Sequence, residues 1–273
     1  MMHPAKRLAA GLFSWTVSSI LLGLSGAHAA DHALWNVLLE RHVRWIDQGH
    51  ASVVDYAGMA HDRVLLEKYL STLSSVDSAA FDRWPKEEQL AFLINAYNAF
   101  TVQLVLTRYP QLDSIKDLGS LLQSPWRKRF VPLLGQKRSL DDLEHGLIRG
   151  SGRYREPRVH FALNCASIGC PALRPEAYHA AGLAAQLEDQ ARRFLGDRSR
   201  NHFADGRLVL SPIFKWYRED FEADGQPLHA YLARYAHELG LNEAQAQALA
   251  AGRIPITFGD YDWRLNDSKR GGP

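Results

Sequence analysis

Residues 88–106 constrain the fold more than any other part of the chain. They read EQLAFLINAYNAFTVQLVL, with Pro85 before them and Pro110 after them. Proline is favoured in the first turn of a helix and stops a helix that reaches it, so the sequence predicts a helix bounded by these two prolines. Because this helix is too apolar to lie on a surface, we expect it to lie inside the protein.

Two amides interrupt this apolar segment. Asn95 and Asn98 are three residues apart and share one face of the predicted helix, and Glu88 projects in roughly the same direction. A buried amide group without a partner costs about 1–3 kcal/mol. The two asparagines are therefore expected either to hold neighbouring loops by hydrogen bonds or to line a polar pocket and bind a substrate.

A third polar side chain falls on a predicted inner face. In residues 139–150, Ser139 and Asp142 have the spacing of a helix capping box. Glu144 lies on the apolar side of this predicted helix, among leucines. A buried carboxylate needs a cation or hydrogen-bond donors. Glu144 could orient a histidine at a catalytic site, or it could pair with an arginine as part of the architecture.

The remaining segments predict more helices joined by short strands. Periodicity and turn signals indicate helices over 33–46, 62–73, 176–195, 213–221 and 228–239, strands over 130–134 and 158–164, a hairpin over 202–211 and an extended tail over 254–258. Regular alternation of strands and helices is missing. We therefore expect an α+β fold, with one helix-rich domain over residues 30–273 around a small, mainly antiparallel sheet.

The first 29 residues have the composition of a secretory signal. Lys6 and Arg7 precede an apolar stretch, and Ala27-His28-Ala29 fits the small-x-small cleavage pattern. Cleavage after Ala29 would leave 273 − 29 = 244 residues. No later segment contains about 18 uninterrupted apolar residues. We therefore expect no stable membrane insertion after cleavage, and a periplasmic or secreted protein.

Charge and motifs exclude several classes of function. The chain has 32 Lys and Arg against 30 Asp and Glu, and Lys6 and Arg7 account for the excess. A neutral mature chain lacks the positive surface that phosphate binding needs, so we expect no nucleic-acid partner. No phosphate loop, dinucleotide fingerprint, HExxH or GxSxG motif occurs. The sequence thus assigns no cofactor and no set of metal ligands.

The segment most informative for function is 158–171, RVHFALNCASIGCP. A strand over 158–164 would place His160 and Asn164 on one face. Asn164 is a favoured helix N-cap residue, so we expect Cys165 to begin a short helical turn. There the backbone N–H groups and the helix dipole would favour the thiolate, which is the nucleophilic form of cysteine. His160 is the nearest candidate for its base or ion-pair partner.

Other roles compete for the same sulfur atom. Cys165 and Cys170 are the only cysteines, and an exported chain with two cysteines tends to pair them as a disulfide. A redox-active pair is a second alternative, although CxxxxC is not the CxxC of thioredoxin-like motifs. A metal site that includes His160 is a third, although steps of five residues do not match common zinc spacings. The residues alone leave these alternatives open.

Five blocks of the chain, taken together, resemble those of a known family. They read FLINAYNAFT (92–101), SLDDLEHGLIR (139–149), RVHFALNCASIGCPALRPEAY (158–178), LSPIFKWYREDF (210–221) and YDWRLN (261–266). In content and order they resemble the domain of unknown function 547 family, over about residues 93–266. The resemblance implies little about activity, because the family is named for the lack of one. It implies that bacterial members are often exported, and the coiled-coil segments of plant members point to protein partners.

The resemblance also carries a set of residues onto this chain. The family blocks correspond to Asn95, Tyr97, Asn98, Glu144, His160, Asn164, Cys165, Ser167, Cys170 and Pro171. They add Tyr97 and Ser167 to the residues that the sequence pattern alone singles out.

Three functions are consistent with these features. The first is a cysteine-dependent hydrolase or acyl or thiol transferase, acting on a small-molecule or peptide substrate, with Cys165 as nucleophile and His160 and Glu144 as further catalytic residues. Substrate-binding residues would then be Asn95, Tyr97, Asn98, Asn164 and Ser167. By analogy of fold alone, such a cysteine suggests a papain-like or transglutaminase-like arrangement.

The other two functions use the cysteines differently. One is a non-catalytic binding or scaffold module, with a protein partner and a permanent Cys165–Cys170 disulfide. The other is a thiol-disulfide or metal-handling protein of the cell envelope.

Overall fold

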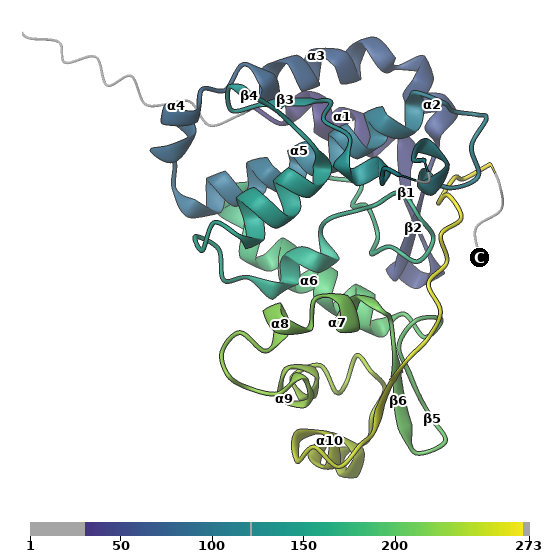
Figure 1. Ribbon diagram of the computed structural model, residues 1–273. Coiled ribbons are helices and arrows are strands. Elements are labelled where there is room, and N and C mark those ends of the chain that lie inside the picture. The colour runs from purple at the N-terminus through teal and green to yellow at the C-terminus, as the bar shows by residue number, and fades with distance from the viewer. Residues whose placement is uncertain (1–30, 121, 270–273) are drawn as a thin grey trace, which may run out of the picture.

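The computed structural model describes residues 31–120 and 122–269. The predicted secretory signal, residues 1–29, lies outside the described residues. Two hydrophobic clusters organise the described part of the chain. The larger cluster comes mainly from elements in the upper part of Figure 1 and the smaller cluster from elements in its lower part; helix α6 (Leu183–Gly196), which contributes to both, lies between them.

Helix α5 (Lys86–Leu106) forms the core of the upper part, so the helix predicted between Pro85 and Pro110 is confirmed. It carries Glu87 and Glu88 in its first turn, where the helix dipole favours acidic groups. The helix is long and apolar enough to cross a membrane by length and composition alone. However, 94% of its apolar window is buried inside the protein, so packing against neighbouring elements covers its apolar faces. The elements that share this part of the molecule are α2 (Tyr56–His61), α3 (Arg63–Ser74), α4 (Ser78–Asp82), η2 (Ile115–Leu118), η3 (Pro125–Arg127) and η6 (Ala180–Gly182).

The helix predicted over 33–46 is wrong in its last turn. Helix α1 ends at His42 (Ala33–His42), and the chain continues as strand β1 (Val43–Ile46). After the short turn η1 (Asp47–Gly49), strand β2 (Ala51–Val54) pairs antiparallel with β1. The β-branched residues at both ends of β1 favour a strand, and the pairing with β2 overrides the helical periodicity of the preceding residues.

The segment after residue 130 follows the sequence pattern closely. Strands β3 (Val131–Leu133) and β4 (Gln136–Arg138) form a hairpin. Next comes η4 (Asp142–Arg149), which is a π-helix. The predicted capping box is present: the backbone N–H of Ser139 donates to Asp142 Oδ2 over 2.8 Å, and the N–H of Asp142 donates to Ser139 Oγ over 3.0 Å.

The lower part contains a small three-stranded sheet. Strands β5 (His202–Ala204) and β6 (Arg207–Leu210) form the predicted hairpin, and Asp205 and Gly206 both adopt the left-handed backbone conformation of such a turn. Strand β7 (Ile256–Phe258) joins β6 in parallel. The helices here are α7 (Ile213–Trp216), α8 (Arg218–Phe221), α9 (Leu228–Ala233) and α10 (Glu243–Ala250).

The strand predicted over 158–164 is wrong. Residues Pro157–Phe161 form the short 3-10 helix η5, because Pro157 favours a helix start and the Glu156 side chain accepts the N–H of Arg158. The fully buried Phe161 then packs into the smaller hydrophobic cluster. Apolar side chains alternate along this segment because they pack into two different hydrophobic clusters. They do not mark the two faces of a strand.

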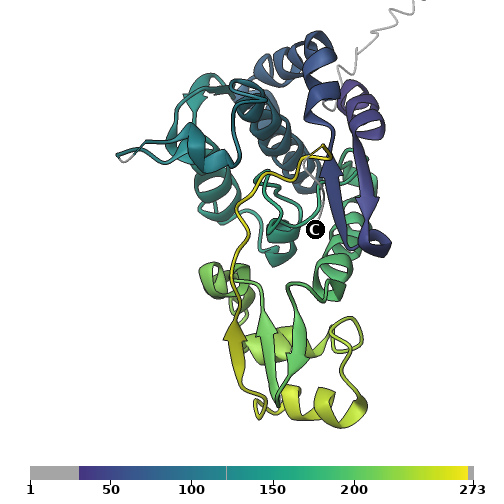
Figure 2. The same cartoon turned by 90° about the vertical axis from the view of Figure 1, so that its right-hand side faces the viewer.

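The predicted α+β class is confirmed. Helices dominate, and the strands form three separate small sheets in which all pairs except β6–β7 are antiparallel. The single domain over 30–273 and the papain-like or transglutaminase-like arrangement stay predictions. From β7 the last described residues run back to the upper part of the molecule, as the yellow segment in Figure 2 shows.

Candidate functional site

Cys165 does not begin a helix, so that prediction is wrong. Asn164 Oδ1 does accept the N–H of Ala166 over 3.0 Å, as a capping side chain would. However, Ala166 adopts a left-handed φ of 63°, and Ser167 forms an antiparallel bridge with Leu265. The returning C-terminal segment thus takes the hydrogen bonds that a helical turn would have formed. Among the described residues no helix begins at Cys165, so the predicted dipole effect on its sulfur has no basis.

The same C-terminal segment packs tightly on the loop between the cysteines. The N–H of Ile168 donates to the carbonyl oxygen of Arg264, and that of Gly169 donates to the carbonyl oxygen of Asp262, both over 2.8 Å. A Cβ at position 169 would lie only 3.0 Å from the Asp262 backbone. The close approach of two backbones therefore favours glycine here, since a larger residue would have to displace the Asp262 backbone slightly.

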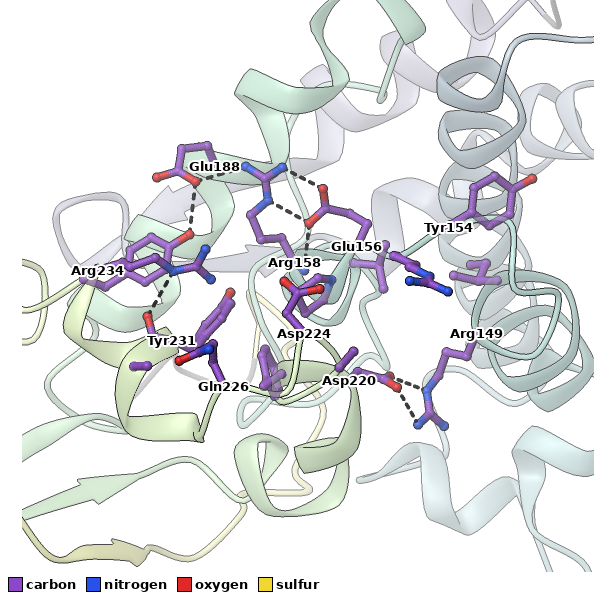
Figure 3. A pocket seen from close by; sticks show the side chains of 18 of the residues that line it. Arg149, Tyr154, Glu156, Arg158, Glu188, Asp220, Asp224, Gln226, Tyr231 and Arg234 are labelled. Carbon is purple, nitrogen blue, oxygen red and sulfur yellow. Dashed lines mark hydrogen bonds and ion pairs between the residues drawn. The ribbon is translucent and has the colours of Figure 1, made fainter. Parts of the chain in front are cut away.

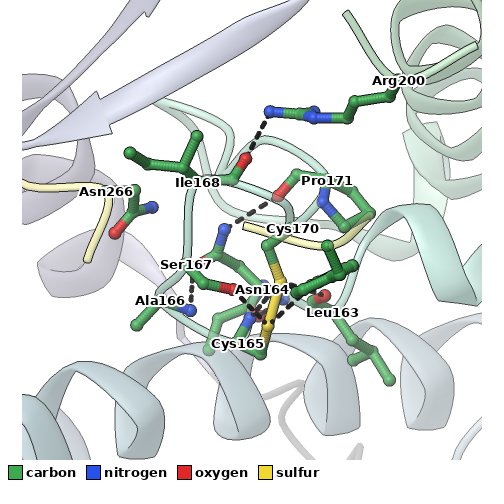
Figure 4. The surroundings of a disulfide bond; sticks show 12 residues. Leu163, Asn164, Cys165, Ala166, Ser167, Ile168, Cys170, Pro171, Arg200 and Asn266 are labelled. Atoms are coloured by element: carbon green, nitrogen blue, oxygen red, sulfur yellow. Dashed lines mark hydrogen bonds between the residues drawn. A yellow bond between two sulfur atoms is a disulfide. The ribbon is translucent and has the colours of Figure 1, made fainter. Parts of the chain in front are cut away.

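Cys165 and Cys170 form a disulfide, with their Cα atoms 6.0 Å apart (Figure 4). The Cys165 N–H points at the sulfur of Cys170, and the Asn164 side chain donates to the carbonyl oxygen of Pro171 over 2.8 Å. Cys170 is buried, whereas Cys165 is partly exposed. Of the two sulfur-bearing residues, Cys165 is therefore the one more open to an incoming molecule.

The disulfide lies in the wall of a cavity of about 320 Å³, which we call the aromatic pocket. Its polar lining includes Glu144, His145 and His160. Its rings come from five places along the chain and are those of Tyr97, Trp126, Trp216, Tyr217, Tyr261 and Trp263. A pocket with aromatic walls and a few convergent polar groups is typical of small-molecule sites.

Two hydroxyl groups contact the Cys165 sulfur. Ser167 Oγ lies 3.1 Å from Cys165 Sγ, and the Tyr261 hydroxyl lies 3.2 Å from it. Burial raises the pKa of Tyr261 to about 12, despite the opposing hydrogen bond from Ser167, so its hydroxyl keeps its proton at neutral pH. Both groups can therefore donate to the sulfur, and donation of this kind stabilises a thiolate.

Glu144 lies at the pocket wall and is only 6% exposed. Its charge acts on the nearby hydroxyls of Tyr97 and Tyr217. Burial first, and the Glu144 charge second, raise the pKa of both tyrosines well above the ordinary value, so both remain neutral donors. In the described part of the chain Glu144 makes no ion pair with a histidine, and its charge lies near two of the pocket's rings.

His160 is oriented by a residue that the sequence analysis did not single out. Its Nε2 lies 2.6 Å from Asp220 Oδ2, and its ring stacks on Tyr217 at 3.8 Å between centroids. Asp220 also accepts from Arg149 Nε over 2.5 Å. Partial burial opposes ionisation of Asp220, but the hydrogen bonds from His160 and Arg149 outweigh it and lower the pKa of its carboxyl group.

Asp220 also lines a second cavity, of about 640 Å³, which we call the arginine pocket (Figure 3). Most charges in it are already paired: Arg158 binds Glu156 and Glu188, and Arg149 binds Asp220. Because Asp220 touches His160 on one side and the arginine pocket on the other, it separates the two cavities.

The buried asparagines connect loops. Asn98 donates to the carbonyl oxygen of Ala162 over 3.0 Å and accepts the N–H of Asn164 over 2.8 Å. Asn95 makes the same pair of bonds to the backbone of Tyr178. Neither lines the aromatic pocket. Asn98 thus fixes the backbone immediately before Cys165.

Of the residues predicted for the site, five line the aromatic pocket: Tyr97, Glu144, His160, Cys165 and Cys170. Ser167 contacts the sulfur without lining the cavity, and Asn95, Asn98 and Asn164 hold the surrounding backbone. Sequence reasoning missed Asp220, Tyr217, Tyr261 and the pocket tryptophans. The motifs LSPIFKWYREDF and YDWRLN contain most of these residues, and they were the available signal.

Within residues 31–120 and 122–269, no three His, Cys, Asp or Glu side chains are grouped so as to hold a metal ion. No curated protein and no solved structure matches the chain. One family model does match: "Protein of unknown function, DUF547", over residues 81–195. That range contains helix α5, Glu144 and both cysteines, whereas Asp220 and Tyr261 lie beyond it. On this match, residues 81–195 of the protein form a DUF547 domain.

Proposed function

We propose that this protein is a thiol-dependent enzyme that binds a small molecule in the aromatic pocket, with Cys165 as the nucleophile. One observation carries the proposal: the Cys165 sulfur lies in the wall of a ligand-sized cavity, between two hydroxyl donors. A structural disulfide needs neither the cavity nor the donors.

The nucleophile would be released by an external thiol. The first thiolate attacks the more exposed Cys165 sulfur, forming a mixed disulfide and releasing Cys170 as a thiolate. A second thiol attacks the external sulfur of that mixed disulfide, so Cys165 leaves as a thiolate and the two external thiols leave joined as a disulfide. Cys165 can then attack an electrophilic carbon in the pocket, whose leaving group takes a proton from solvent or from His160.

Alkylation by iodoacetamide at pH 7 tests this role. Cys170→Ser leaves Cys165 as the only thiol, and Cys165→Ser leaves only Cys170. We expect Cys165 to be alkylated at least about tenfold faster than Cys170, because it is more exposed and its thiolate is hydrogen-bonded. Tyr261→Phe in the Cys170→Ser background should slow the reaction several-fold, through the loss of one donor to a charged sulfur.

Tyr235→Phe is the matched control for Tyr261→Phe. Its hydroxyl binds Glu188 in the arginine pocket, away from the sulfur, so the alkylation rate of Cys165 should not change. Equal rates for Cys165 and Cys170, or a Cys165 rate that Tyr261→Phe does not alter, would contradict the nucleophile.

A binding module without catalysis is the second candidate. It is favoured by the disulfide itself and by His160, whose Nε2 is engaged by Asp220 rather than by sulfur. In that case the Cys165→Ser/Cys170→Ser variant would keep its ligand affinity and lose only stability. Closing a short loop stabilises a protein modestly, by about 2 kcal/mol.

We also propose that the chain is exported to the periplasm or secreted, since an oxidising compartment maintains a disulfide. The intact mass of the exported protein should correspond to a chain that begins at Ala30, with 273 − 29 = 244 residues. Replacing Ala27 and Ala29 by lysine should block this cleavage. Recovery of the full-length chain from the cytoplasm alone would contradict export.

A further inference from the structure

Apart from His145 and His160, the charged lining of the aromatic pocket has one sign. Asp141 and Glu144 both line it, and no lysine or arginine of the described residues does. Asp141 is partly neutralised at the surface, where it pairs with Arg127 over 3.3 Å. The negative charge that faces the interior of the pocket is therefore mainly that of Glu144.

Glu144 is buried without a counter-ion in direct contact. In the described part of the chain it forms no ion pair with Lys, Arg or His, and the nearby hydroxyls of Tyr97 and Tyr217 are neutral. The nearby Arg149 is engaged by Asp220. A buried charge that lacks an opposite charge is costly, so a cation that enters the pocket would gain from its presence.

The aromatic walls favour the same kind of ligand. Trp216, Tyr261 and Trp263 form a continuous cluster, with ring centroids 4.4–5.9 Å apart. Ring faces carry partial negative charge and attract cations. The Lys116 ammonium already lies 3.7 Å from the Trp263 centroid, although Lys116 does not line the pocket. One ring of the cluster thus already binds an ammonium group of this chain.

We propose that the ligand of the aromatic pocket is a small molecule that carries an ammonium group, bound between the ring faces and the Glu144 carboxylate. This proposal rests on the proposed function only because both place the ligand in the same pocket. It adds the chemical class of the substrate. The ammonium group would supply the positive counter-charge that Glu144 lacks. The remainder of the ligand would lie against the Cys165–Cys170 wall.

Choline and its uncharged isostere 3,3-dimethyl-1-butanol test this inference, because they share a shape and differ in charge. Binding is measured by calorimetry and by tryptophan fluorescence on the oxidised protein, and again on the Cys165→Ser/Cys170→Ser variant. We expect choline to bind at least about tenfold more tightly than the isostere in both forms. n-Propylammonium, a second probe, covers ligands with a primary amine.

Two variants locate the effect within the pocket. Glu144→Gln should remove most of the preference for choline, and Trp216→Leu, at the partly exposed rim, should weaken choline binding several-fold. Trp216→Leu keeps the test informative if Glu144→Gln fails to fold. Asp224→Asn changes a carboxylate of the arginine pocket and is the matched control, with no expected effect.

The outcomes separate the two proposals. Equal binding of choline and the isostere, or no binding of either cation up to about 10 mM, overturns the ammonium ligand whatever the reactivity of Cys165. An unchanged preference in a folded Glu144→Gln variant overturns it as well. Selective cation binding together with a slow Cys165 would support the ligand class and reject the nucleophile.

Discussion

Asn98→Ala is expected to lower the free energy of unfolding by about 2–6 kcal/mol. The substitution leaves the carbonyl oxygen of Ala162 and the N–H of Asn164 without their partner, in a region where Asn98 is only 2% exposed. Each buried polar group that loses its hydrogen bond costs about 1–3 kcal/mol. Urea unfolding followed by circular dichroism measures the change.

Gln103→Ala is the matched control for Asn98→Ala. Gln103 lies on the same helix α5, is half-buried, and makes no side-chain hydrogen bond within the described residues. Its replacement should change the free energy of unfolding by less than about 0.5 kcal/mol. If both variants unfolded at the same urea concentration, Asn98 would not connect α5 to the Cys165 loop as described.

Asp220→Asn is expected to destabilise the protein by about 2–4 kcal/mol at pH 7. The carboxylate accepts from both His160 and Arg149, and the amide cannot replace two charge-assisted bonds. Asp82→Asn is the control, because Asp82 pairs with Arg153 over 2.6 Å on an exposed surface. Exposed ion pairs contribute about 0–1 kcal/mol, so the free energy of unfolding of Asp82→Asn should stay close to that of the parent protein.

The pH dependence gives the Asp220 prediction a second measurement. The pKa of Asp220 is lower in the folded protein than in the unfolded chain, where it is about 3.9. Its stabilising contribution is therefore complete above that pH and is lost as the pH falls through the lower, folded value. The stability difference between parent and Asp220→Asn should hold from pH 5 to about pH 4 and shrink below it. A difference that stayed constant well below pH 4 would show that His160 and Arg149 do not lower this pKa.

Sequence patterns over a few neighbouring residues correctly predicted the elements that those same residues stabilise. The helix between Pro85 and Pro110, the capping box at Ser139 and the hairpin at Asp205-Gly206 all appear as expected. In each case neighbouring residues supply the proline, the cap or the left-handed turn that the structure uses.

The errors arose where distant segments decide the conformation. Val43 to Ile46 leave the helical pattern because a strand pairs with them, and Cys165 fails to start a helix because Leu265 pairs with Ser167, 98 residues along the chain. No short-range pattern contains that information. The predicted thiolate site depended on a helix dipole, and the groups now found at the sulfur are hydroxyls.

The candidate site could be predicted only in part, because distant segments also decide which residues meet there. Glu144 was identified as a polar residue in an apolar setting, and His160 as the histidine nearest to Cys165 in the sequence; both line the aromatic pocket. Asp220 lies in the charged sequence RED, where a carboxylate has the appearance of an ordinary surface residue. Only its position beside His160 and Arg149 distinguishes it.

The return of the C-terminal segment has a consequence for biosynthesis. Tyr261 and Trp263 complete the aromatic pocket, and Leu265 pairs with Ser167 in the loop of the two cysteines, so these parts are translated after the cysteines. A ribosome that has released everything up to strand β7 has produced the helical core and both thiols, but not the wall that covers them. The cysteines are thus synthesised before the segment that covers them, and the binding pocket is complete only once residues 261–265 have been added.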